Sequence, residues 1–460
     1  MISATDVYPL FVGEGNFHQL LFVNETTKAL QNKDQALFSV EFQAGGNNDF
    51  SNGQASFYDL HTRLCISTGM RAINHYLFFD GENDPVLSPV KRHDWGHPVR
   101  KDGTLRKHYF RYPQLSSVLH SYGTDLITAQ PETVAAIGFL LDNFMTEINN
   151  NNTQKATNII THQREVILCD MIARGLALTQ RPFTMLELTR TQLNPATTPN
   201  LWLMIEKQCP AEVQQKLVNY VKQGGKLILV GRLCDETFDH QPCTILPEAL
   251  GIETVAGGRP FTQDTLTVFQ HHDVPASFVE AYTGQFDAIF ATDGNGRTVG
   301  FRKKLGQGQV LLLGAALAAN TLDDIDIVHQ LALQIDCQPL FTLSEWVDAR
   351  LSVGENGRFL FLNNYQDDPV QTTVEYKNEP LFGGQPIHLP ARQGLILPLD
   401  WRLNDEILLH YCTAEITEIT QDGQTFLLKT RPDACTAEFI MPNKQVKIAS
   451  KDGQLQLHPK

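Results

Sequence analysis

The first 80 residues alternate between strand-like and helix-like segments, which limits the folds open to this part of the chain. Short apolar runs predict strands, and the amphipathic segments between them predict helices. The expected strands are 2–8, 37–42 and 72–79, and the expected helices are 17–30 and 54–69. Such alternation places the strands parallel in one sheet, with the helices as crossovers. A closed barrel of such units has eight strands, whereas residues 1–125 offer three.

The rest of the chain is expected to form two further domains. A polar run of asparagines ends an ambiguous stretch, so residues 126–157 are interpreted as a connecting segment. Residues 158–340 alternate strands and helices again, and the apolar strands expected at 226–230, 288–292 and 310–314 are typical of a buried parallel sheet. From 341 to 460, short alternating runs separated by Asn, Gly and Pro predict an antiparallel β module. The predicted fold class is therefore a multidomain α/β protein.

Composition narrows the kinds of partner. The 460 residues hold 37 Lys and Arg against 51 Asp and Glu, a net charge of -14, and no basic run. Binding to nucleic acid or to an anionic membrane is therefore not expected, and a neutral ligand fits better. The eight cysteines lack the spacing of a zinc site and are expected to be free, mostly buried thiols, and no glycine-rich nucleotide-binding loop is present. The sequence shows no export signal and no long apolar run, which predicts a cytoplasmic protein.

Glu41 is the strongest catalytic candidate. It stands at the carboxyl end of an expected parallel strand and is followed by Gly45 and Gly46, and that end of a strand faces the active site of a barrel. The alternative is a buried Glu paired with an arginine such as Arg71. Glu82 follows the next strand, where substrate contact and loop capping are both open.

Aromatic side chains near the same strand ends could stack on a sugar ring. The candidates are Tyr8, Phe42, Tyr76, Phe79 and Trp95. Core packing is the favoured alternative for the two phenylalanines, because Phe is so often buried. Trp95 lies in a polar loop and is the better stacking candidate.

Two further groups of residues are weaker candidates, one for a metal site and one for a cysteine nucleophile. His93, Asp94 and His97 match no firm metal-ligand spacing, so a solvated loop is the preferred interpretation. Cys234 follows the strand expected at 226–230, but the segment lacks the glycine spacing of a nucleophile elbow. The domain formed by residues 158–340 is therefore expected to be non-catalytic.

Three segments resemble the second half of the catalytic barrel of family 35 glycoside hydrolases, in the branch of β-galactosidases and exo-β-glucosaminidases. They are FSVEFQAG (38–45), STGMRAINHYLFFDGEN (67–83) and DWGHPVRKDGTLRKHY (94–109). The resemblance implies strands six to eight of a (β/α)8 barrel, followed by a glutamine-amidotransferase-like three-layer α/β domain and β-sandwich-like domains. It also implies retaining hydrolysis of terminal β-linked galactose or glucosamine.

The resemblance assigns roles to individual residues. Glu41 matches the nucleophile at the end of the seventh strand, Asn74 and Tyr76 match positions of the eighth strand near the glycone, and the segment from Asp6 to Tyr8 resembles the end of the sixth. The implied substrate-binding set is Tyr8, Gln43, Asn74, Tyr76, Glu82 and Trp95.

The sequence departs from the family at the acid/base residue. In the family this Glu follows Asn at the end of the fourth strand, whereas Asn24 and Glu25 here fall in an expected helix. A retaining glycosidase needs two carboxyl groups about 5 Å apart. The resemblance therefore implies a β-linked oligosaccharide substrate, a separate chain that carries the first barrel half, and a possible homo-oligomer. The alternative is an inactive truncated remnant that binds carbohydrate or mediates oligomerisation.

Overall fold

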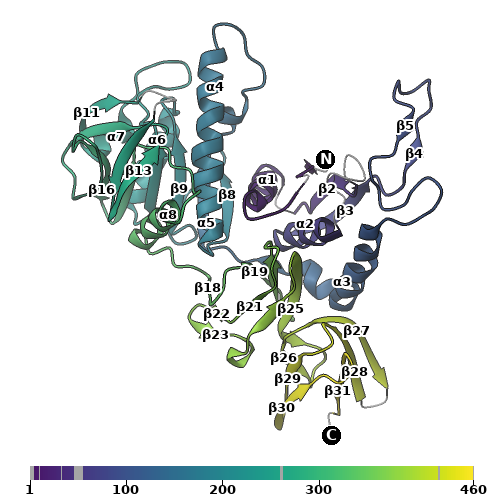
Figure 1. Cartoon of the computed structure of the whole chain (residues 1–460). Coiled ribbons are helices and arrows are strands. Elements are labelled where there is room, and N and C mark those ends of the chain that lie inside the picture. The colour runs from purple at the N-terminus through teal and green to yellow at the C-terminus, as the bar shows by residue number, and fades with distance from the viewer. Residues whose placement is uncertain are drawn as a thin grey trace. The chain divides into compact units, whose positions relative to one another are not determined.

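The computed structural model describes residues 5–9, 11–32, 34–45, 55–258, 263–422 and 425–458. The chain folds as two compact units (Figure 1). Unit 1 combines residues 1–132 with residues 341–460, whereas unit 2 is the continuous stretch 133–340. The end of unit 2 coincides with the expected boundary. Its start differs, because the expected connecting segment 126–157 contributes a strand to the sheet of unit 2.

The N-terminal part of unit 1 is a three-stranded parallel sheet, as the alternating pattern predicts. Its elements are β1 (Thr5–Val7), α1 (Phe17–Leu30), β2 (Leu37–Gln43), α2 (Ala55–Ser67) and β3 (Met70–Tyr76). The strands lie in the order β1-β2-β3, so β2 is the central one. Gly69 has φ +95°, which suits glycine and ends α2 where the sequence places a stop.

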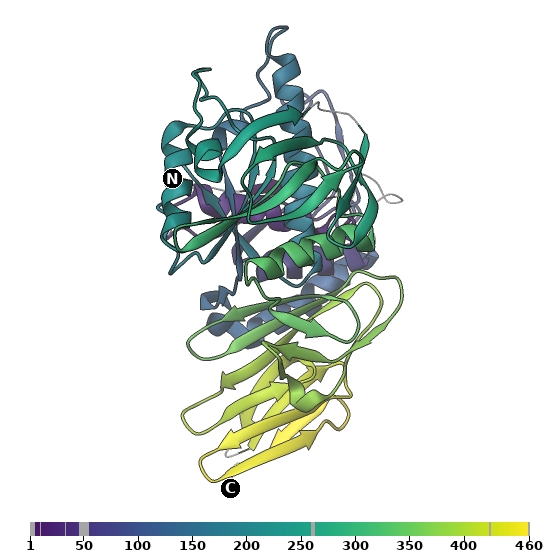
Figure 2. The same ribbon diagram turned by 90° about the vertical axis from the view of Figure 1, so that its left-hand side faces the viewer.

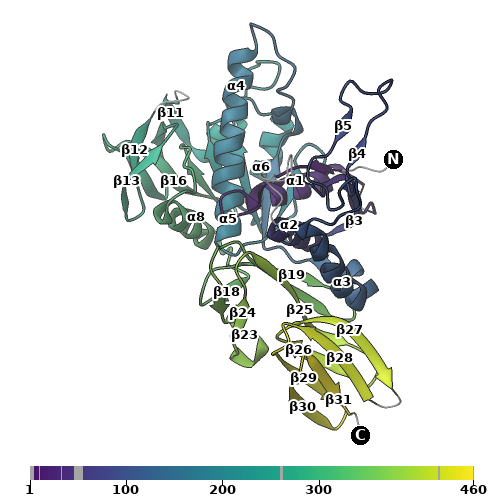
Figure 3. The same ribbon diagram turned by 45° about the vertical axis from the view of Figure 1, so that its right-hand side comes forward.

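A hairpin and a long helix follow this sheet. The hairpin consists of β4 (Gly81–Glu82) and β5 (Arg92–His93), and it extends away from the three strands (Figure 3). A short 3-10 turn, η1 (Lys107–Phe110), leads into α3 (Arg111–Thr128), which is kinked at Gly123. The sequence pattern did not indicate the hairpin, because its strands are only two residues long.

The C-terminal half of unit 1 is antiparallel, as expected, and Figure 2 shows its last strands in yellow. Its main sheet has the order β30-β29-β26-β25-β20-β19-β6. These strands are β6 (Gln130–Pro131), β19 (Asp348–Val353), β20 (Arg358–Asn364), β25 (Gln393–Arg402), β26 (Leu408–Cys412), β29 (Thr436–Met441) and β30 (Lys444–Ala449). A smaller sheet contains β27 (Glu415–Asp422), β28 (Thr425–Arg431) and β31 (Gln454–Leu457). Because β6 precedes unit 2, the two ends of unit 1 share one sheet.

Shorter antiparallel pairs complete this module. They are formed by β18 (Phe341–Leu343), β21 (Val370–Thr372), β22 (Val374–Tyr376), β23 (Glu379–Pro380) and β24 (Ile387–Leu389).

A buried ionic network joins α2 to the C-terminal module. The guanidinium of Arg63 bonds to Asp59 at 3.0 Å and also pairs with Glu415 of β27. The carboxylates also accept backbone N–H bonds, Asp59 from Gly394 and Glu415 from Ile396. Burial opposes the charge of Arg63, but the two carboxylates outweigh it and raise the pKa of the guanidinium. These bonds make the C-terminal module part of the same compact unit as the parallel sheet.

An apolar core lies between α3 and the C-terminal sheets. Tyr122 packs edge-on to Trp401, and its hydroxyl donates to the carbonyl oxygen of Ile396 at 2.7 Å. The surrounding core includes Phe359, Leu409 and further buried apolar residues of the β strands. The antiparallel module is therefore held to α3 by burial as well as by hydrogen bonds.

Unit 2 is built on one large mixed sheet. Five parallel strands lie in the order β17-β10-β9-β7-β8. They are β7 (Ala135–Phe139), β8 (Phe183–Glu187), β9 (Asn200–Ile205), β10 (Lys226–Gly231) and β17 (Gly308–Leu313). Their side chains are nearly all buried, which agrees with helices on both faces.

Antiparallel strands extend this sheet beyond β17. They are β11 (Ile252–Gly257), β12 (Asp264–Val268), β13 (His271–Ala276), β14 (Glu280–Gly284), β15 (Ala288–Asp293) and β16 (Thr298–Leu305). The expectation of a buried parallel strand at 288–292 is wrong, because β15 pairs antiparallel with β12 and β16 and is only partly buried. An apolar run of five residues does not reveal the direction of its partners.

The helices of unit 2 include one long stretch that runs from α4 (Gln154–Gln163) through the π-helical η3 (Arg164–Ala173) into α5 (Arg174–Leu178). The others are α6 (Ala211–Lys222), α7 (Ile245–Leu250) and α8 (Leu322–Gln334). A capping box formed by Thr321 and Asp324 starts α8. No helix within the described ranges is long and apolar enough to cross a membrane.

Candidate active site

The strand β2 carries Glu41 near its carboxyl end, on the face away from α2. Side chains alternate along a strand, and Phe42 stacks on His61 of α2 at 4.1 Å between ring centroids. The carboxylate of Glu41 turns instead toward Tyr8, the residue that follows β1. The carboxylate is half-buried, and its Oε2 accepts a hydrogen bond of 3.0 Å from the hydroxyl of Tyr8.

The alternative pairing of Glu41 with Arg71 is not what the structure shows. The guanidinium of Arg71 donates to the backbone carbonyls of Ile66, Met70 and Ala129. Those contacts fix the start of β3 against the end of α3. The described hydrogen bond of Glu41 comes instead from Tyr8, a phenol that leaves the negative charge of the carboxylate uncompensated.

The aromatic candidates form a row of neighbouring rings whose first member, Tyr8, bonds to Glu41. Tyr8 packs edge-on to Tyr76, with ring centroids 6.4 Å apart, and Tyr76 packs in the same way on His93 at 6.1 Å. The ring centroids of His93 and Trp95 are in turn 4.4 Å apart. Tyr8 and Trp95 are 38% and 40% exposed, so the two ends of the row are open to a ligand. The structure thus connects Tyr8, Tyr76 and Trp95 through His93, a residue that the sequence had suggested only as a weak metal ligand.

Two of the polar candidates, Asn74 and Gln43, donate hydrogen bonds to backbone carbonyls. The Asn74 amide donates to the carbonyl of Val40 at 2.8 Å, which ties β3 to β2 beside Glu41. Gln43 is fully buried, and its amide donates to the carbonyl of Gly45 at 3.0 Å. Both side chains therefore shape the strand ends around Glu41.

Glu82 lies elsewhere than the sequence predicted. It belongs to the β4–β5 hairpin and not to the end of β3. Its carboxylate is exposed and pairs with Lys101, whose hydrogen bond and charge hold the Glu82 pKa below its usual value. It lines a charged pocket of about 400 Å³ with Asp80, Arg92 and Arg106. The loop-stabilising interpretation of Glu82 accounts for these contacts.

The two phenylalanines differ in exposure. Phe42 packs in the core between the sheet and α2, whereas Phe79 is 51% exposed. His61 is fully buried against Phe42, and burial followed by the nearby His75 lowers the His61 pKa to about 3. The imidazole is therefore neutral, and β2 rests on an apolar layer on the side opposite Glu41.

A buried cluster missed by the sequence analysis holds the Trp95 loop in place. The carboxylate of Asp80 bonds to His97 Nδ1 at 2.8 Å and to the guanidinium of Arg106 at 2.7 Å, and Arg106 also donates to the carbonyl of His97. A Cβ on Gly45 would lie 2.8 Å from the His97 ring, so only glycine permits this contact. The cluster joins the loop directly to the turn after β2. The sequence analysis named His97 but placed it in a solvated loop, whereas the structure buries it at 1% exposure.

Asp6 is the backbone partner of Glu41 in the register of β1 and β2, and its side chain lies outside the described part of the chain. Gly46 is likewise outside it.

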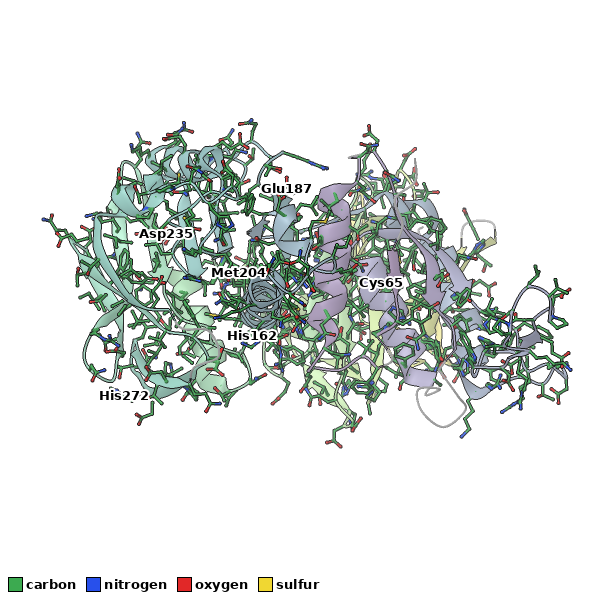
Figure 4. All side chains as sticks on the ribbon, turned by 90° about the horizontal axis from the view of Figure 1, so that it is seen from above. Cys65, His162, Glu187, Met204, Asp235 and His272 are labelled. Atoms are coloured by element: carbon green, nitrogen blue, oxygen red, sulfur yellow. The ribbon has the colours of Figure 1, made fainter. Side chains whose placement is uncertain are left out.

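In unit 2 the carboxyl ends of the parallel strands carry buried acids. Glu187 ends β8 (Figure 4) and accepts hydrogen bonds from Thr189 and from the backbone of Arg190. Glu206 follows β9, and burial raises its pKa to about 8. Cys234 is fully buried and hydrogen-bonded to Cys209; this bond and burial raise the Cys234 pKa well above its usual value. A thiol held neutral in this way is a poor nucleophile.

Comparison with known proteins supports a glycoside-hydrolase-like fold. Residues 151–285 match the family model "GLMA-like, second domain". The chain is 23% identical over 398 residues to a β-1,2-glucosyltransferase of Ignavibacterium album, covering 82% of this chain and 54% of that protein. It is also 23% identical over 398 residues to an exo-β-D-glucosaminidase of Pyrococcus horikoshii, covering 82% and 48%. The chain thus spans about half the length of these curated relatives.

Solved structures give the same result for the fold. A β-galactosidase from Bacillus circulans superposes with a TM-score of 0.69 at 15% identity, covering 86% of this chain and 60% of that one. A family 42 β-galactosidase from G. stearothermophilus gives a TM-score of 0.68 at 12% identity, covering 86% and 59%. The chain therefore has a multidomain α/β fold like that of glycoside hydrolases, and the comparisons do not single out family 35.

Proposed function

We propose that this chain supplies the nucleophile of a retaining glycosidase that removes terminal β-linked galactose or glucosamine. The observation that carries the proposal is Glu41, a half-buried carboxylate near the carboxyl end of the central parallel strand, bonded by Tyr8. Strand ends of this kind bear the active sites of (β/α)8 barrels. The row of aromatic rings beside it offers a surface for the apolar face of a sugar.

The proposed reaction is a double displacement. A Glu41 oxygen attacks the anomeric carbon while a carboxylic acid donates a proton to the departing glycosidic oxygen. The resulting glycosyl ester is then hydrolysed by water, which gives up a proton to the same carboxylate. Tyr8 would hold Glu41 in position through its hydrogen bond. When Glu41 forms the ester it loses its negative charge, and the Tyr8 hydroxyl would then donate to an oxygen of the ester. No metal or organic cofactor is required.

The proton donor is proposed to come from a further polypeptide segment with the first five βα units of the barrel. Within the described residues, β1 and β3 each pair along one edge only, and such edges accept further strands. The sheet would then be strands six to eight of the barrel, as in the family 35 resemblance. Unit 2 would correspond to the amidotransferase-like domain of that family, without catalysis of its own, and a homo-oligomer is part of the same proposal.

The test measures hydrolysis of aryl β-galactoside and aryl β-glucosaminide by the chain alone and with any upstream-encoded polypeptide that carries five βα units. Turnover is expected for the assembly, none for the chain alone, and none for an assembly that contains Glu41→Gln. Equal rates for wild type and Glu41→Gln would overturn the nucleophile assignment. An assembly that forms but hydrolyses neither glycoside would favour the non-catalytic alternative, a carbohydrate-binding or oligomerisation module.

A second candidate is transfer of a glucosyl group to another sugar. It is favoured by the likeness to a protein named as a β-1,2-glucosyltransferase. The first displacement at Glu41 would be the same, and a sugar hydroxyl would replace water in the second. Adding glucose oligosaccharides to the assay separates the two: transfer yields longer products, whereas hydrolysis yields only free sugar.

A further inference from the structure

Two pairs of cysteines are in thiol–thiol contact, although no two of the eight cysteines are close in sequence. Cys209 and Cys234 are hydrogen-bonded in unit 2, and Cys412 and Cys435 are hydrogen-bonded in the C-terminal module of unit 1. All four are free thiols in the structure. The two pairs differ in access to solvent, which decides what chemistry each can undergo.

Neighbouring antiparallel strands bring Cys412 and Cys435 together. Cys412 is the last residue of β26 and is the register partner of Ala437 in β29, so Cys435 lies two residues away, on the diagonal. Thr413 and Thr436 close the strand ends against each other, because the backbone N–H of Thr413 donates to the carbonyl of Thr436 at 2.9 Å. Diagonal neighbours of this kind project from the same face of the sheet, and here the two thiols are hydrogen-bonded.

The backbone of Cys435 is fixed from the other side. Its N–H donates to the Ser450 hydroxyl at 2.8 Å, and its carbonyl accepts from the Ser450 N–H at 2.9 Å. The Cys435 sulfur also lies 3.5 Å from the Thr430 hydroxyl. These contacts hold the sulfur at the end of the sheet, beside Cys412.

Solvent reaches one thiol of this pair. Cys435 is half-buried and follows the exposed residues 432–434, whereas Cys412 is fully buried. The hydrogen bond from Cys412 outweighs burial and, with the Thr430 and Ser450 hydroxyls, holds the Cys435 pKa below its usual value. Cys209 and Cys234 are both buried, at 4% and 0% exposure. Cys435 can therefore meet an oxidant in the folded protein, and the unit 2 pair cannot.

We propose that Cys412 and Cys435 form a site of reversible oxidation to a disulfide by small disulfides such as oxidised glutathione. The Cys435 thiolate attacks one sulfur of oxidised glutathione, forming a mixed disulfide and releasing one glutathione thiolate. The Cys412 thiol then loses its proton and attacks the Cys435 sulfur, which expels the second glutathione thiolate. In balance, two protein thiols and one oxidised glutathione give one protein disulfide and two reduced glutathiones.

The bond would close a loop that contains β27 and β28, including the buried Glu415 that pairs with Arg63. Cross-linking a loop stabilises the folded state mainly by restricting the unfolded chain. The thermal midpoint of unit 1 is therefore expected to rise by about 5 °C on oxidation. Reduction with dithiothreitol should return it to its starting value.

The test incubates the native full chain with oxidised glutathione, blocks the remaining thiols, and maps the peptides by mass spectrometry without reduction. Free thiols are expected to fall from eight to six, with Cys412 and Cys435 in one linked peptide pair. Cys412→Ser should stop at a single glutathione adduct on Cys435, and Cys435→Ser should form neither the adduct nor the disulfide. The Cys209 and Cys234 thiols, recovered unlinked, are the internal control.

Three outcomes would overturn the proposal. They are eight free thiols after native incubation, a stable glutathione adduct on Cys435 in the wild type, and a 412–435 link that appears only under unfolding conditions. The full chain is tested throughout, and circular dichroism shows whether each serine variant is folded.

Discussion

The carboxyl ends of the parallel strands look different in the two units. In unit 1, Glu41 is half-buried, bonded by one phenol and adjacent to exposed aromatic rings. In unit 2, Glu206 follows the parallel strand β9 and Glu280 is the first residue of the antiparallel strand β14; both are buried, and burial raises the pKa of both. Glu280 is further occupied by the backbone of Leu233 and the hydroxyl of Tyr282. Both sheets have acids where an α/β fold usually binds ligands, but Glu206 and Glu280 are enclosed, whereas Glu41 is half-buried.

An acidic residue at a strand end can therefore act as a catalytic group only where its surroundings allow it. A nucleophile must be ionised and must reach the substrate. Glu206, with its pKa near 8, is protonated at neutral pH and enclosed, so it serves the packing of unit 2. The proposed function therefore depends on Glu41, and substitution of the acids of unit 2 is expected to change the reaction rate little.

The largest effect is expected from matched carboxamide substitutions in the two units. Glu41→Gln should lower the rate of the complemented enzyme by at least about 1,000-fold, because it removes the nucleophile. Glu206→Gln should leave the rate within about twofold, since Gln resembles the protonated acid. Steady-state hydrolysis of an aryl β-galactoside measures both. A large loss in Glu206→Gln with intact folding would break the contrast between the units.

The next effect concerns the buried network that joins α2 to the C-terminal module. Arg63→Met should destabilise unit 1 by about 3–5 kcal/mol, because it leaves the buried Asp59 and Glu415 without their main counter-charge. Urea unfolding followed by circular dichroism gives the value.

The control for this prediction is an exposed ion pair on the same β27–β28 hairpin. Lys429 and Glu418 are both about half exposed, 2.6 Å apart. Lys429→Met should cost less than about 1 kcal/mol. Equal losses in the two variants would show that burial of the Arg63 network does not matter.

A pH effect is expected in unit 2. The Glu206 pKa rises from 4.5 in the unfolded chain to about 8 in the fold, so between these values the folded state binds the extra proton. The free energy of unfolding should therefore fall as pH rises from about 5 to about 8, by an amount on the order of a few kcal/mol. Glu206→Gln should reduce this slope, and the part that remains is assigned to Glu280, whose pKa burial also raises. An unchanged slope would mean that Glu206 ionises freely in the fold.

The smallest effect is expected at Tyr8. Tyr8→Phe keeps the ring that packs on Tyr76 but removes the hydrogen bond to Glu41. A bond to a charged group in a partly exposed site suggests about a 10-fold loss in kcat/KM. Trp95→Phe, which keeps a ring at the other end of the row, should mainly raise KM. A larger loss from Trp95→Phe than from Glu41→Gln would reverse the order of importance.

Local patterns in the sequence predicted much of the parallel architecture. The apolar runs that became β2, β10 and β17 and the helices α1 and α2 were expected within two residues of their observed ends. Glu41 was found because its strand is followed by glycines, and Gly45 proves to be the point where the Trp95 loop packs. These features depend on residues that are near one another in sequence.

Contacts between distant residues were not predicted. The strand β7 lay in an ambiguous stretch, and its place between β8 and β9 depends on long-range pairing. The Asp80 cluster needs Arg106, 26 residues further on, and Glu415 is far from Arg63 in sequence. Glu82 was misplaced because the pattern could not distinguish the end of β3 from the hairpin after it.

The most direct test of the central claim is covalent trapping. The complemented enzyme would be incubated with a 2-deoxy-2-fluoro-β-galactosyl or a corresponding glucosyl donor, which slows breakdown of a glycosyl ester. Peptide mass spectrometry is predicted to find one sugar attached to Glu41, with no label in Glu41→Gln. A sugar on another residue, or turnover without any covalent intermediate, would contradict the claim that Glu41 is the nucleophile.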